Sequence, residues 1–172
     1  LPILLTLDAK VIVQGINNKK IFPLNKFFIS YRKTKLKKGE FIYSIKIPIN
    51  KENIFKAYKI SKRFDDDISS VCGSFSFLIK KNKITKAVIA YGGMSEIPKR
   101  ASTIEKKLIN SDFSENTFSK VVNLINKDFS PIDDMRASRN YRLSVAKNLL
   151  LKAFYEINNK KIIRINWWEM NN

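Results

Sequence analysis

The sequence contains no histidine and only one cysteine among its 172 residues. A disulfide needs two cysteines, and protein zinc and iron–sulfur sites need several cysteine or histidine ligands. This chain alone therefore cannot build a disulfide, a zinc site or an iron–sulfur cluster, and histidine acid–base catalysis is excluded. Because Cys72 lies in an apolar run between Val71 and Gly73, we interpret it as a small buried core residue.

Long apolar runs are also missing. No segment approaches the roughly 18 apolar residues that a membrane-spanning helix requires. The apolar start at residues 1–7 has neither a preceding basic segment nor a cleavage signature of a secretory signal. We therefore predict a cytoplasmic chain without a membrane partner. Its length and 44% hydrophobic content suffice for the core of one domain with an appended subdomain.

Acidic residues are scarce, since 15 carboxylates face 33 lysines and arginines and leave a net charge of +18. Such a charge suggests a nucleic-acid-binding module. The lysines, however, are spread along the whole chain, often as pairs at expected turns, including Lys19-Lys20, Lys80-Lys81 and Lys160-Lys161. This distribution favours a solvated surface. A basic nucleic-acid-binding module remains the alternative function.

Alternating apolar residues predict strands over most of the first half. A short β-branched segment at 10–14, a turn at 15–20 and the apolar pair at 21–22 predict a hairpin. Alternation over 41–48 predicts a half-buried strand, and together with the further strands it suggests an antiparallel sheet. The further strands are predicted at 55–60, 71–79 and 84–91.

Helical spacing replaces alternation in the second half. Apolar residues are spaced for a helix near 104–109, and Ser114 is a candidate N-cap for the next helix. A last helix is predicted from about Ser138. The predicted fold class is therefore α+β, with an antiparallel sheet of three or more strands packed against C-terminal helices.

A dense charge cluster occupies residues 59–68, where basic residues run into the consecutive carboxylates Asp65, Asp66 and Asp67. Neighbouring carboxylates raise one another's pKa, whereas nearby cations lower it. Such a local field is typical of functional sites. Because Asp also suits turns and helix N-termini, a local structural role stays equally open.

Four motifs in one order carry a family resemblance. The chain resembles the flavin domain of xanthine dehydrogenases, and above all the bacterial small subunit, which joins an iron–sulfur region to an FAD domain. The resemblance covers nearly the whole chain, and it rests on Tyr31-Arg32-Lys33-Thr34, on residues 39–48 (GEFIYSIKIP), on residues 57–68 (AYKISKRFDDDI), and on Tyr91-Gly92-Gly93-Met94.

The resemblance implies a division of the chain. Residues 1–30 would be the C-terminal tail of an FAD-binding domain of the PCMH type, 31–160 a domain like the CO dehydrogenase flavoprotein C-terminal domain, and 161–172 a tail. Leu1-Pro2 resembles the segment directly after the family's Ser-Asp flavin contact. The Gly-rich pyrophosphate loop and the iron–sulfur region precede that point in the family. We therefore expect the isolated chain to bind FAD poorly and to be inactive as an enzyme.

The resemblance also implies a function. A molybdopterin cofactor on a partner subunit would oxidise hypoxanthine or xanthine, [2Fe-2S] clusters would pass electrons to FAD, and NAD would be the acceptor. The partners would be the molybdenum subunit and the N-terminal iron–sulfur and FAD region. This chain would shape and tune the flavin site without a catalytic residue or metal ligand of its own. A second alternative is a non-catalytic remnant that retains only the subunit-docking fold.

Four positions are candidate flavin-site residues by this resemblance. Ile42 occupies a position that is usually Leu and touches the flavin. Lys59 matches a lysine that contacts FAD, where a cation would stabilise the anionic reduced ring. Arg63 and Asp66 belong to a charged loop beside the flavin and would influence its potential in opposite directions. For Lys59 the competing interpretation is an ordinary lysine at a strand end.

Two further features have structural interpretations that we favour. Gly92-Gly93 could cradle a phosphate, but without a following Gly-Lys-Ser pattern it predicts a tight turn. Trp167-Trp168 could stack on a ring, but aromatic residues near a chain end usually dock on a core or on another subunit.

Overall fold

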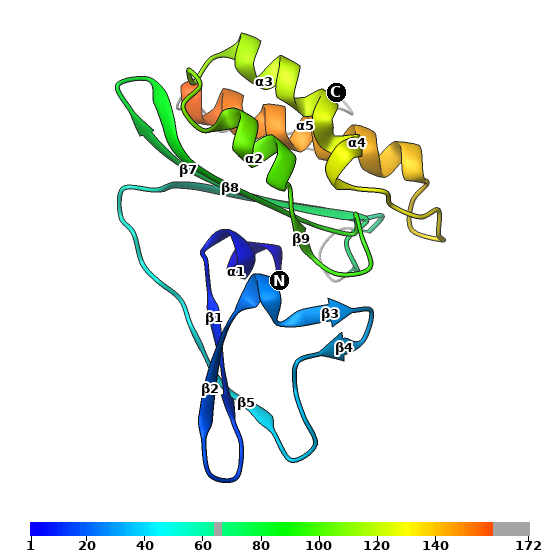
Figure 1. Ribbon diagram of the computed structural model, residues 1–172. Helices are drawn as coiled ribbons and strands as arrows, with labels where there is room; N and C mark the ends of the chain where they lie inside the picture. Colours follow the sequence, from blue (N-terminus) through cyan, green and yellow to red (C-terminus); the bar gives the residue numbers. More distant parts are fainter. Residues whose placement is uncertain (64–66, 160–172) are drawn as a thin grey trace.

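A computed structural model describes residues 1–63 and 67–159 (Figure 1). The described residues fold into two main antiparallel sheets and the small two-stranded sheet β3-β4, with a helical layer on one side of the second main sheet. The elements in chain order are α1 (Pro2–Thr6), β1 (Lys10–Gln14), β2 (Lys19–Pro23), the 3-10 helix η1 (Leu24–Lys26), β3 (Phe28–Ser30), β4 (Lys33–Thr34), β5 (Phe41–Lys46), β6 (Ile54–Ile60), β7 (Val71–Lys80), β8 (Lys83–Gly92), β9 (Lys99–Arg100), α2 (Ser102–Leu108), α3 (Glu115–Val121), the 3-10 helix η2 (Val122–Leu124), α4 (Ile125–Asp128) and α5 (Arg139–Asn158).

The C-terminal sheet has the strand order β6-β7-β8-β9 and contains the two longest strands, β7 and β8. Alternate residues of β7 point to opposite faces, so that Phe75 and Phe77 enter the core beneath the helices while Cys72 and Ser74 point the other way. The turn between β7 and β8 uses Lys81 and Asn82, both with positive φ, as a tight hairpin requires. The predicted fold class is confirmed.

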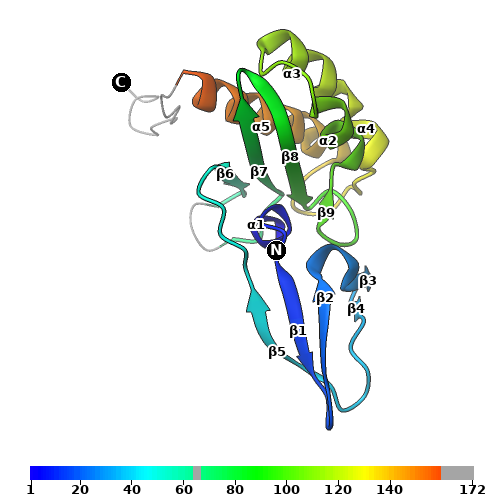
Figure 2. The ribbon, with the colours of Figure 1, turned by 60° about the vertical axis from the view of Figure 1, so that its left-hand side comes forward.

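Helices α2 to α5 cover one face of this sheet (Figures 1 and 2). The predicted N-cap is present, since the Ser114 hydroxyl accepts a hydrogen bond from the Thr117 N–H at 3.3 Å. The last helix begins after Ser138 as predicted, and the Ser138 hydroxyl caps it by accepting a hydrogen bond from the Tyr141 N–H at 3.2 Å. The long helix α5 turns its buried side, which includes Leu150, toward the sheet. Aromatic rings from strands and helices interlock in this core.

The N-terminal sheet has the strand order β2-β1-β5, and the predicted hairpin at 10–22 is the β1–β2 pair. Strand β5 pairs with β1 rather than with β6, so the strands expected in one sheet form two. The expected half-burial of the 41–48 strand is wrong, because most of its side chains are exposed. Apolar alternation identifies a strand, but the packing of the whole molecule decides whether either face is covered.

Helix α1 joins the two sheets and was not expected from the sequence. Pro2 stands at its first position, where a missing N–H costs nothing. Leu5 packs in one small core with Val11 and Val13 of β1 and with Ala90 of β8. The helix therefore lies between the sheets, as Figures 1 and 2 both show.

Candidate functional site

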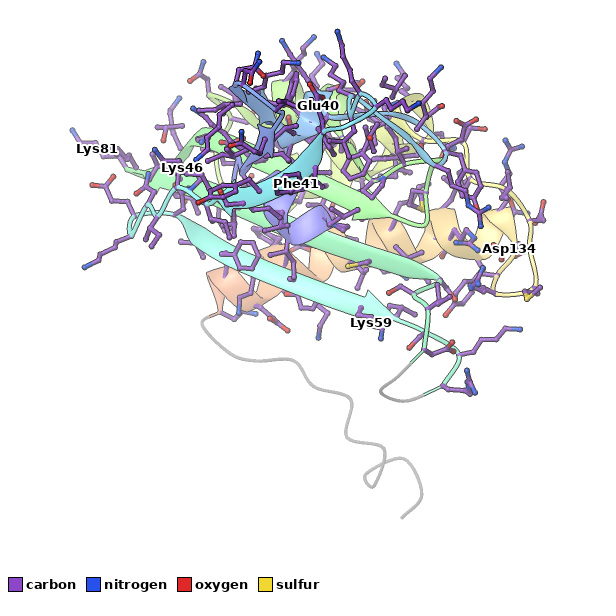
Figure 3. All side chains as sticks on the ribbon, turned by 90° about the horizontal axis from the view of Figure 1, so that it is seen from below. Glu40, Phe41, Lys46, Lys59, Lys81 and Asp134 are labelled. Carbon is purple, nitrogen blue, oxygen red and sulfur yellow. The ribbon has the colours of Figure 1, made fainter. Side chains whose placement is uncertain are left out.

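Lys59 lies near the end of β6 and is exposed (Figure 3). The neighbouring side chain, Tyr58, points to the opposite face and donates a hydrogen bond to Glu156 of α5 at 2.9 Å. Because neighbouring strand residues alternate between faces, Lys59 points away from the helical layer. We call this side of the C-terminal sheet the α1 side.

The sheet register places Lys59 in a row with small residues on the α1 side. Lys59 is opposite Cys72, and Cys72 is opposite Gly92 on the next strand. Helix α1 begins at the end of this row, since a Cβ added to Gly92 would lie 3.1 Å from the Pro2 Cγ. The absence of a side chain at Gly92 therefore allows the start of α1 to approach the sheet closely.

The single cysteine is half-buried in this row. Burial raises the pKa of the Cys72 thiol, and the positive charge of Lys59 opposes that rise. A thiol with a raised pKa is a poor nucleophile. The expectation that Cys72 is a buried core residue is wrong, because it is only partly buried and points away from the core beneath the helices.

Ile42 lies in the other sheet, on β5, and 46% of its surface is exposed. It is the cross-strand partner of Val13, which is fully buried in the core beneath α1. Cross-strand partners share a face, so Ile42 lies on the face of the N-terminal sheet that α1 covers. The structure thus places Ile42 and Lys59 in different sheets, with α1 between the two sheets.

The charged loop is described only in part. The Asp67 carboxylate accepts hydrogen bonds from the backbone N–H groups of Arg63 and Ile68, at 3.1 and 2.8 Å, and lies 3.5 Å from the Arg63 guanidinium. The backbone hydrogen bond from Arg63 is the main cause that holds the pKa of Asp67 below its ordinary value. Asp67 therefore stabilises the local turn, while the Arg63 side chain is 80% exposed. Asp66 lies outside the described residues, and so do Trp167 and Trp168.

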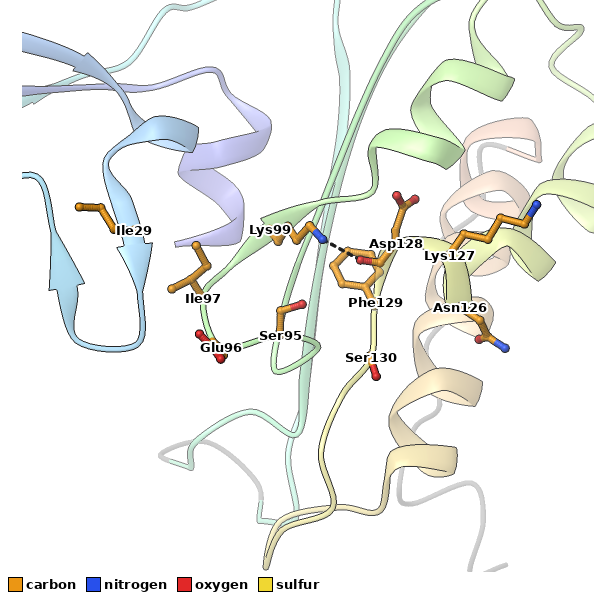
Figure 4. Close-up of a pocket in the computed structure, with 10 residues that line it drawn as sticks. All are labelled: Ile29, Ser95, Glu96, Ile97, Lys99, Asn126, Lys127, Asp128, Phe129 and Ser130. Carbon is orange, nitrogen blue, oxygen red and sulfur yellow. Dashed lines mark hydrogen bonds between the residues drawn. The ribbon is translucent and has the colours of Figure 1, made fainter.

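A cavity of about 710 Å³, with a largely apolar lining that includes several charged and hydroxyl side chains, opens where the N-terminal unit meets the helical layer. Its wall contains Tyr31 from the first motif, Gly93 from the fourth motif, and Asp134, Arg136 and Arg142 from the C-terminal half. A neighbouring cavity of about 420 Å³ shares Ser95, Glu96 and Ser130 with it (Figure 4). In the wall of this smaller cavity, the Lys99 ammonium donates a hydrogen bond to the Asp128 carbonyl at 3.0 Å (Figure 4).

Arg142 organises the larger cavity and was not singled out as a site residue from the sequence. Only 3% of its surface is exposed, and its guanidinium donates to the carbonyls of Ser70 and Gly93 and to the Asp134 carboxylate. Gly93 has a φ of +80°, and a Cβ there would lie 2.3 Å from the Ser70 carbonyl oxygen. The tight-turn interpretation of Gly92-Gly93 is therefore preferred. The available sequence signal for a buried role was the position of Arg142 on the core-facing side of the predicted last helix.

Metal chemistry and membrane insertion find no support in the part of the chain that the structure describes. No group of three histidine, cysteine or carboxylate side chains could hold a metal ion in residues 1–63 and 67–159. Over the same ranges, no helix has the length and apolar character needed to cross a bilayer.

These features define a two-sheet α+β module with an exposed lysine and apolar side chains beside the helix that joins its sheets. Residues 56–157 match the model of the CO dehydrogenase flavoprotein C-terminal domain, and residues 1–50 match the FAD binding domain in molybdopterin dehydrogenase. The chain therefore belongs to the CO dehydrogenase flavoprotein C-terminal domain family. The resemblance inferred from the four motifs is confirmed for the flavoprotein domain family, while its narrower assignment to xanthine dehydrogenases stays a prediction.

Curated relatives carry several different activities in their names. The chain is 28% identical over 158 residues to the glyceraldehyde dehydrogenase medium chain of Sulfolobus acidocaldarius. This match covers 91% of this chain and 56% of the relative. It is 26% identical over 161 residues to the xanthine dehydrogenase of Emericella nidulans, covering 91% of this chain and 12% of that protein. The chain thus spans about half of the first relative and a small part of the second.

Solved structures share the fold. Quinoline 2-oxidoreductase from Pseudomonas putida 86 superposes with a TM-score of 0.80 at 21% identity, over 94% of this chain and 56% of that chain. A carbon monoxide dehydrogenase from Hydrogenophaga pseudoflava superposes with a TM-score of 0.82 at 18% identity, over 90% and 55%. At this identity the likeness establishes the architecture.

Proposed function

We propose that this chain forms part of the FAD site of a molybdenum hydroxylase of the xanthine dehydrogenase kind. In that role it shapes the flavin site through which electrons from iron–sulfur clusters reach NAD during the oxidation of hypoxanthine or xanthine. The partner would be a molybdopterin-containing subunit, and the FAD pyrophosphate would be held by the remainder of the flavin domain. When bound, FAD supplies the exchange between two-electron and one-electron transfer.

One observation carries this proposal. The start of α1 and Lys59 are more than fifty residues apart in sequence, yet they lie at the two ends of one row across the C-terminal sheet. Lys59 resembles a flavin contact of the family, and Leu1-Pro2 resembles the segment directly after another one; the row between them consists of Cys72 and Gly92. This row supports a flavin surface on the α1 side of the C-terminal sheet, to which Ile42 would contribute from the other sheet.

The side chains on this surface suit a flavin. Lys59 presents an ammonium group, which favours negative charge on a neighbouring ring. The exposed apolar side chain of Ile42 suits contact with a flat aromatic surface. Asp66 and Arg63 stay predicted parts of the site. The domain division at residue 30 also stays a prediction. The two family matches end at residue 50 and begin at residue 56, so residues 51–55 lie between them.

The larger cavity, beside Tyr31, supports a binding place for an electron acceptor. Tyr31 is 65% exposed, and the cavity is large enough for part of a dinucleotide. Arg136 offers a cation at the wall, and Ser95 and Ser130 offer hydroxyl groups. These groups fit the ribose and phosphate groups of NAD.

The distribution of charge gives less support to the nucleic-acid alternative. Lysines occur in strands of both sheets and in helices α2, α3, α4 and α5. Figure 3 shows basic side chains projecting around the whole outline of the molecule. A nucleic-acid interface needs its cations gathered along one face, whereas these cations are dispersed.

The test uses the intact flavoprotein that contains this chain, together with its partner subunits. We expect about one FAD per protein and NAD reduction when hypoxanthine is added. Glyceraldehyde serves as the competing substrate, because a curated relative acts on it by name. NAD reduction with glyceraldehyde and none with purines would replace the purine assignment, and a protein that purifies and reconstitutes without any FAD would overturn the proposal.

A further inference from the structure

One buried side chain, Arg142, joins the ends of two strands of the C-terminal sheet. A single nitrogen of its guanidinium, Nη1, donates to the Ser70 carbonyl directly before β7 and, at 2.9 Å, to the Gly93 carbonyl directly after β8. The other terminal nitrogen, Nη2, donates to the Asp134 carboxylate. We call these four residues the Arg142 cluster.

The Ser70 side of the cluster leads to Lys59. The Ser70 N–H donates to the Ile60 carbonyl at 2.8 Å, and Ile60 directly follows Lys59 at the end of β6. The Ser70 hydroxyl donates to the Arg136 carbonyl at 3.2 Å, in the loop that the Asp134 carboxylate closes by accepting from the Arg136 N–H. The backbone beside Lys59 is therefore tied to the cluster through one residue.

The Gly93 side of the cluster leads to the start of α1. Gly93 follows Gly92, and the missing side chain of Gly92 leaves the space in which Pro2 approaches the sheet. Two consecutive glycines have wide backbone freedom, and Gly93 has a φ of +80°. The hydrogen bond from Arg142 to the Gly93 carbonyl restrains this freedom. Arg142 thus restrains both ends of the row that runs from Lys59 to Gly92.

Stability alone gives a weak reason for burying this cation. A buried ion pair loses its hydration, and exchange of such a pair for apolar side chains is often neutral or stabilising. Arg142 is 3% exposed, yet each of its three nitrogens has an acceptor, since Nε donates to the Ala137 carbonyl at 3.4 Å. N–H groups directed from one rigid plane define the positions of their acceptors, which apolar packing does not. The geometry therefore suits a positional role.

We propose that Arg142 is a positioning residue for the flavin. Through the Ser70 carbonyl it sets the place of Lys59, and through the Gly93 carbonyl it sets the place of the start of α1. The inference rests on the proposed function, because the row that begins at Lys59 is the surface assigned there to the flavin. Figure 3 shows Lys59 and Asp134 toward the same end of the C-terminal sheet. Arg142 acts on the flavin through the position of the backbone rather than through its own charge.

The test is the two-electron midpoint potential of the flavin in the intact flavoprotein with its partner subunits. Arg142→Lys keeps the positive charge but lacks the planar fork that reaches two carbonyls and a carboxylate. We expect the equilibrium constant for flavin reduction to fall about threefold, which lowers the potential by about 15 mV. In a Lys59→Ala background, Arg142→Lys should produce no further shift, because the cation that it positions is gone.

Two further variants serve as controls. Phe77 is fully buried in β7, toward the end of the strand that lies away from Ser70. Phe77→Leu should therefore lower the midpoint of chemical denaturation and leave the flavin potential unchanged. Asp134→Asn separates position from charge. Loss of a negative charge would by itself raise the potential, whereas a loosened Arg142 lowers it.

Four outcomes would overturn the inference: an unchanged potential in Arg142→Lys, a raised potential in Asp134→Asn, equal Arg142→Lys shifts with and without Lys59→Ala, and an equal shift in Phe77→Leu. Asp134→Asn decides the matter if Arg142→Lys does not yield folded protein. Failure of the proposed function has a different signature, because the parent protein would then hold no FAD, or Lys59→Ala alone would leave the potential unchanged.

Discussion

The two sheets differ in how completely they bury their apolar residues. The C-terminal sheet encloses a large core of interlocking aromatic and aliphatic side chains beneath its helices. The N-terminal sheet shares a small core with α1 and leaves Phe41 and Tyr43 exposed. Because apolar burial is the main source of stability, the C-terminal sheet and its helices should supply most of the stability of the described chain, and the N-terminal sheet less of it.

Truncation of one phenylalanine in each sheet should give the largest contrast. Phe75 is fully buried, and Phe41 is exposed. We expect Phe75→Ala to lower the free energy of unfolding by about 3–5 kcal/mol, and Phe41→Ala to change it by less than about 1 kcal/mol. Chemical denaturation measures both. Equal losses would show that the two sheets form one core.

The polar anchor of the C-terminal unit should be almost as sensitive. Arg142→Met leaves the Ser70 and Gly93 carbonyls without their donor and Asp134 without its partner. A loss of about 3 kcal/mol is expected, because buried partners are left unsatisfied. Arg63→Met, at a side chain that is 80% exposed, is the matched control and should be nearly neutral. If Arg142→Met were equally neutral, the loop around the cavity would not depend on this arginine.

Acid sensitivity should also separate the two units. Burial would raise the pKa of Glu156, but hydrogen bonds from Lys152, Tyr58 and Lys56 outweigh it and lower the pKa to about 2. The stabilisation is therefore complete above the ordinary value of 4.5 and is lost as the pH falls toward 2. Glu156→Gln should remove about 2 kcal/mol at neutral pH and flatten the acid dependence.

Glu40 in the N-terminal unit is the control for this titration. Its pKa is lowered mainly by the hydrogen bond from Lys20. The Lys20 side chain of this ion pair is 35% exposed, although that of Glu40 is 8% exposed, and contact with solvent weakens such pairs. Glu40→Gln should therefore leave the acid profile of unfolding almost unchanged, and a large effect would contradict the weak coupling of the N-terminal unit.

The strongest sequence patterns predicted the structure best. The apolar strands β7 and β8, the N-cap Ser114 and the start of the last helix near Ser138 are local signals, and they were identified correctly. Helix α1 was missed because its five residues are held by packing between two sheets rather than by their own helix propensity. The separation into two sheets depends on strand pairing, which alternation does not encode.

The candidate site was predictable only through resemblance. Lys59 is one of many lysines in the chain, and neither spacing nor composition distinguishes it. Its place in a row with Cys72 and Gly92 follows from the register of three strands. The role of Arg142 was also hidden, because its partners Ser70 and Gly93 are distant in sequence.

The flavin midpoint potential in the intact flavoprotein tests the central claim most directly. Lys59→Ala removes a cation from the α1 side, and Lys106→Ala removes an exposed lysine from α2 on the helical side. We expect Lys59→Ala to lower the two-electron potential by about 30 mV, which corresponds to about 1.4 kcal/mol, and Lys106→Ala to leave it unchanged. Identical potentials for both variants and the parent protein would contradict the placement of the flavin beside Lys59.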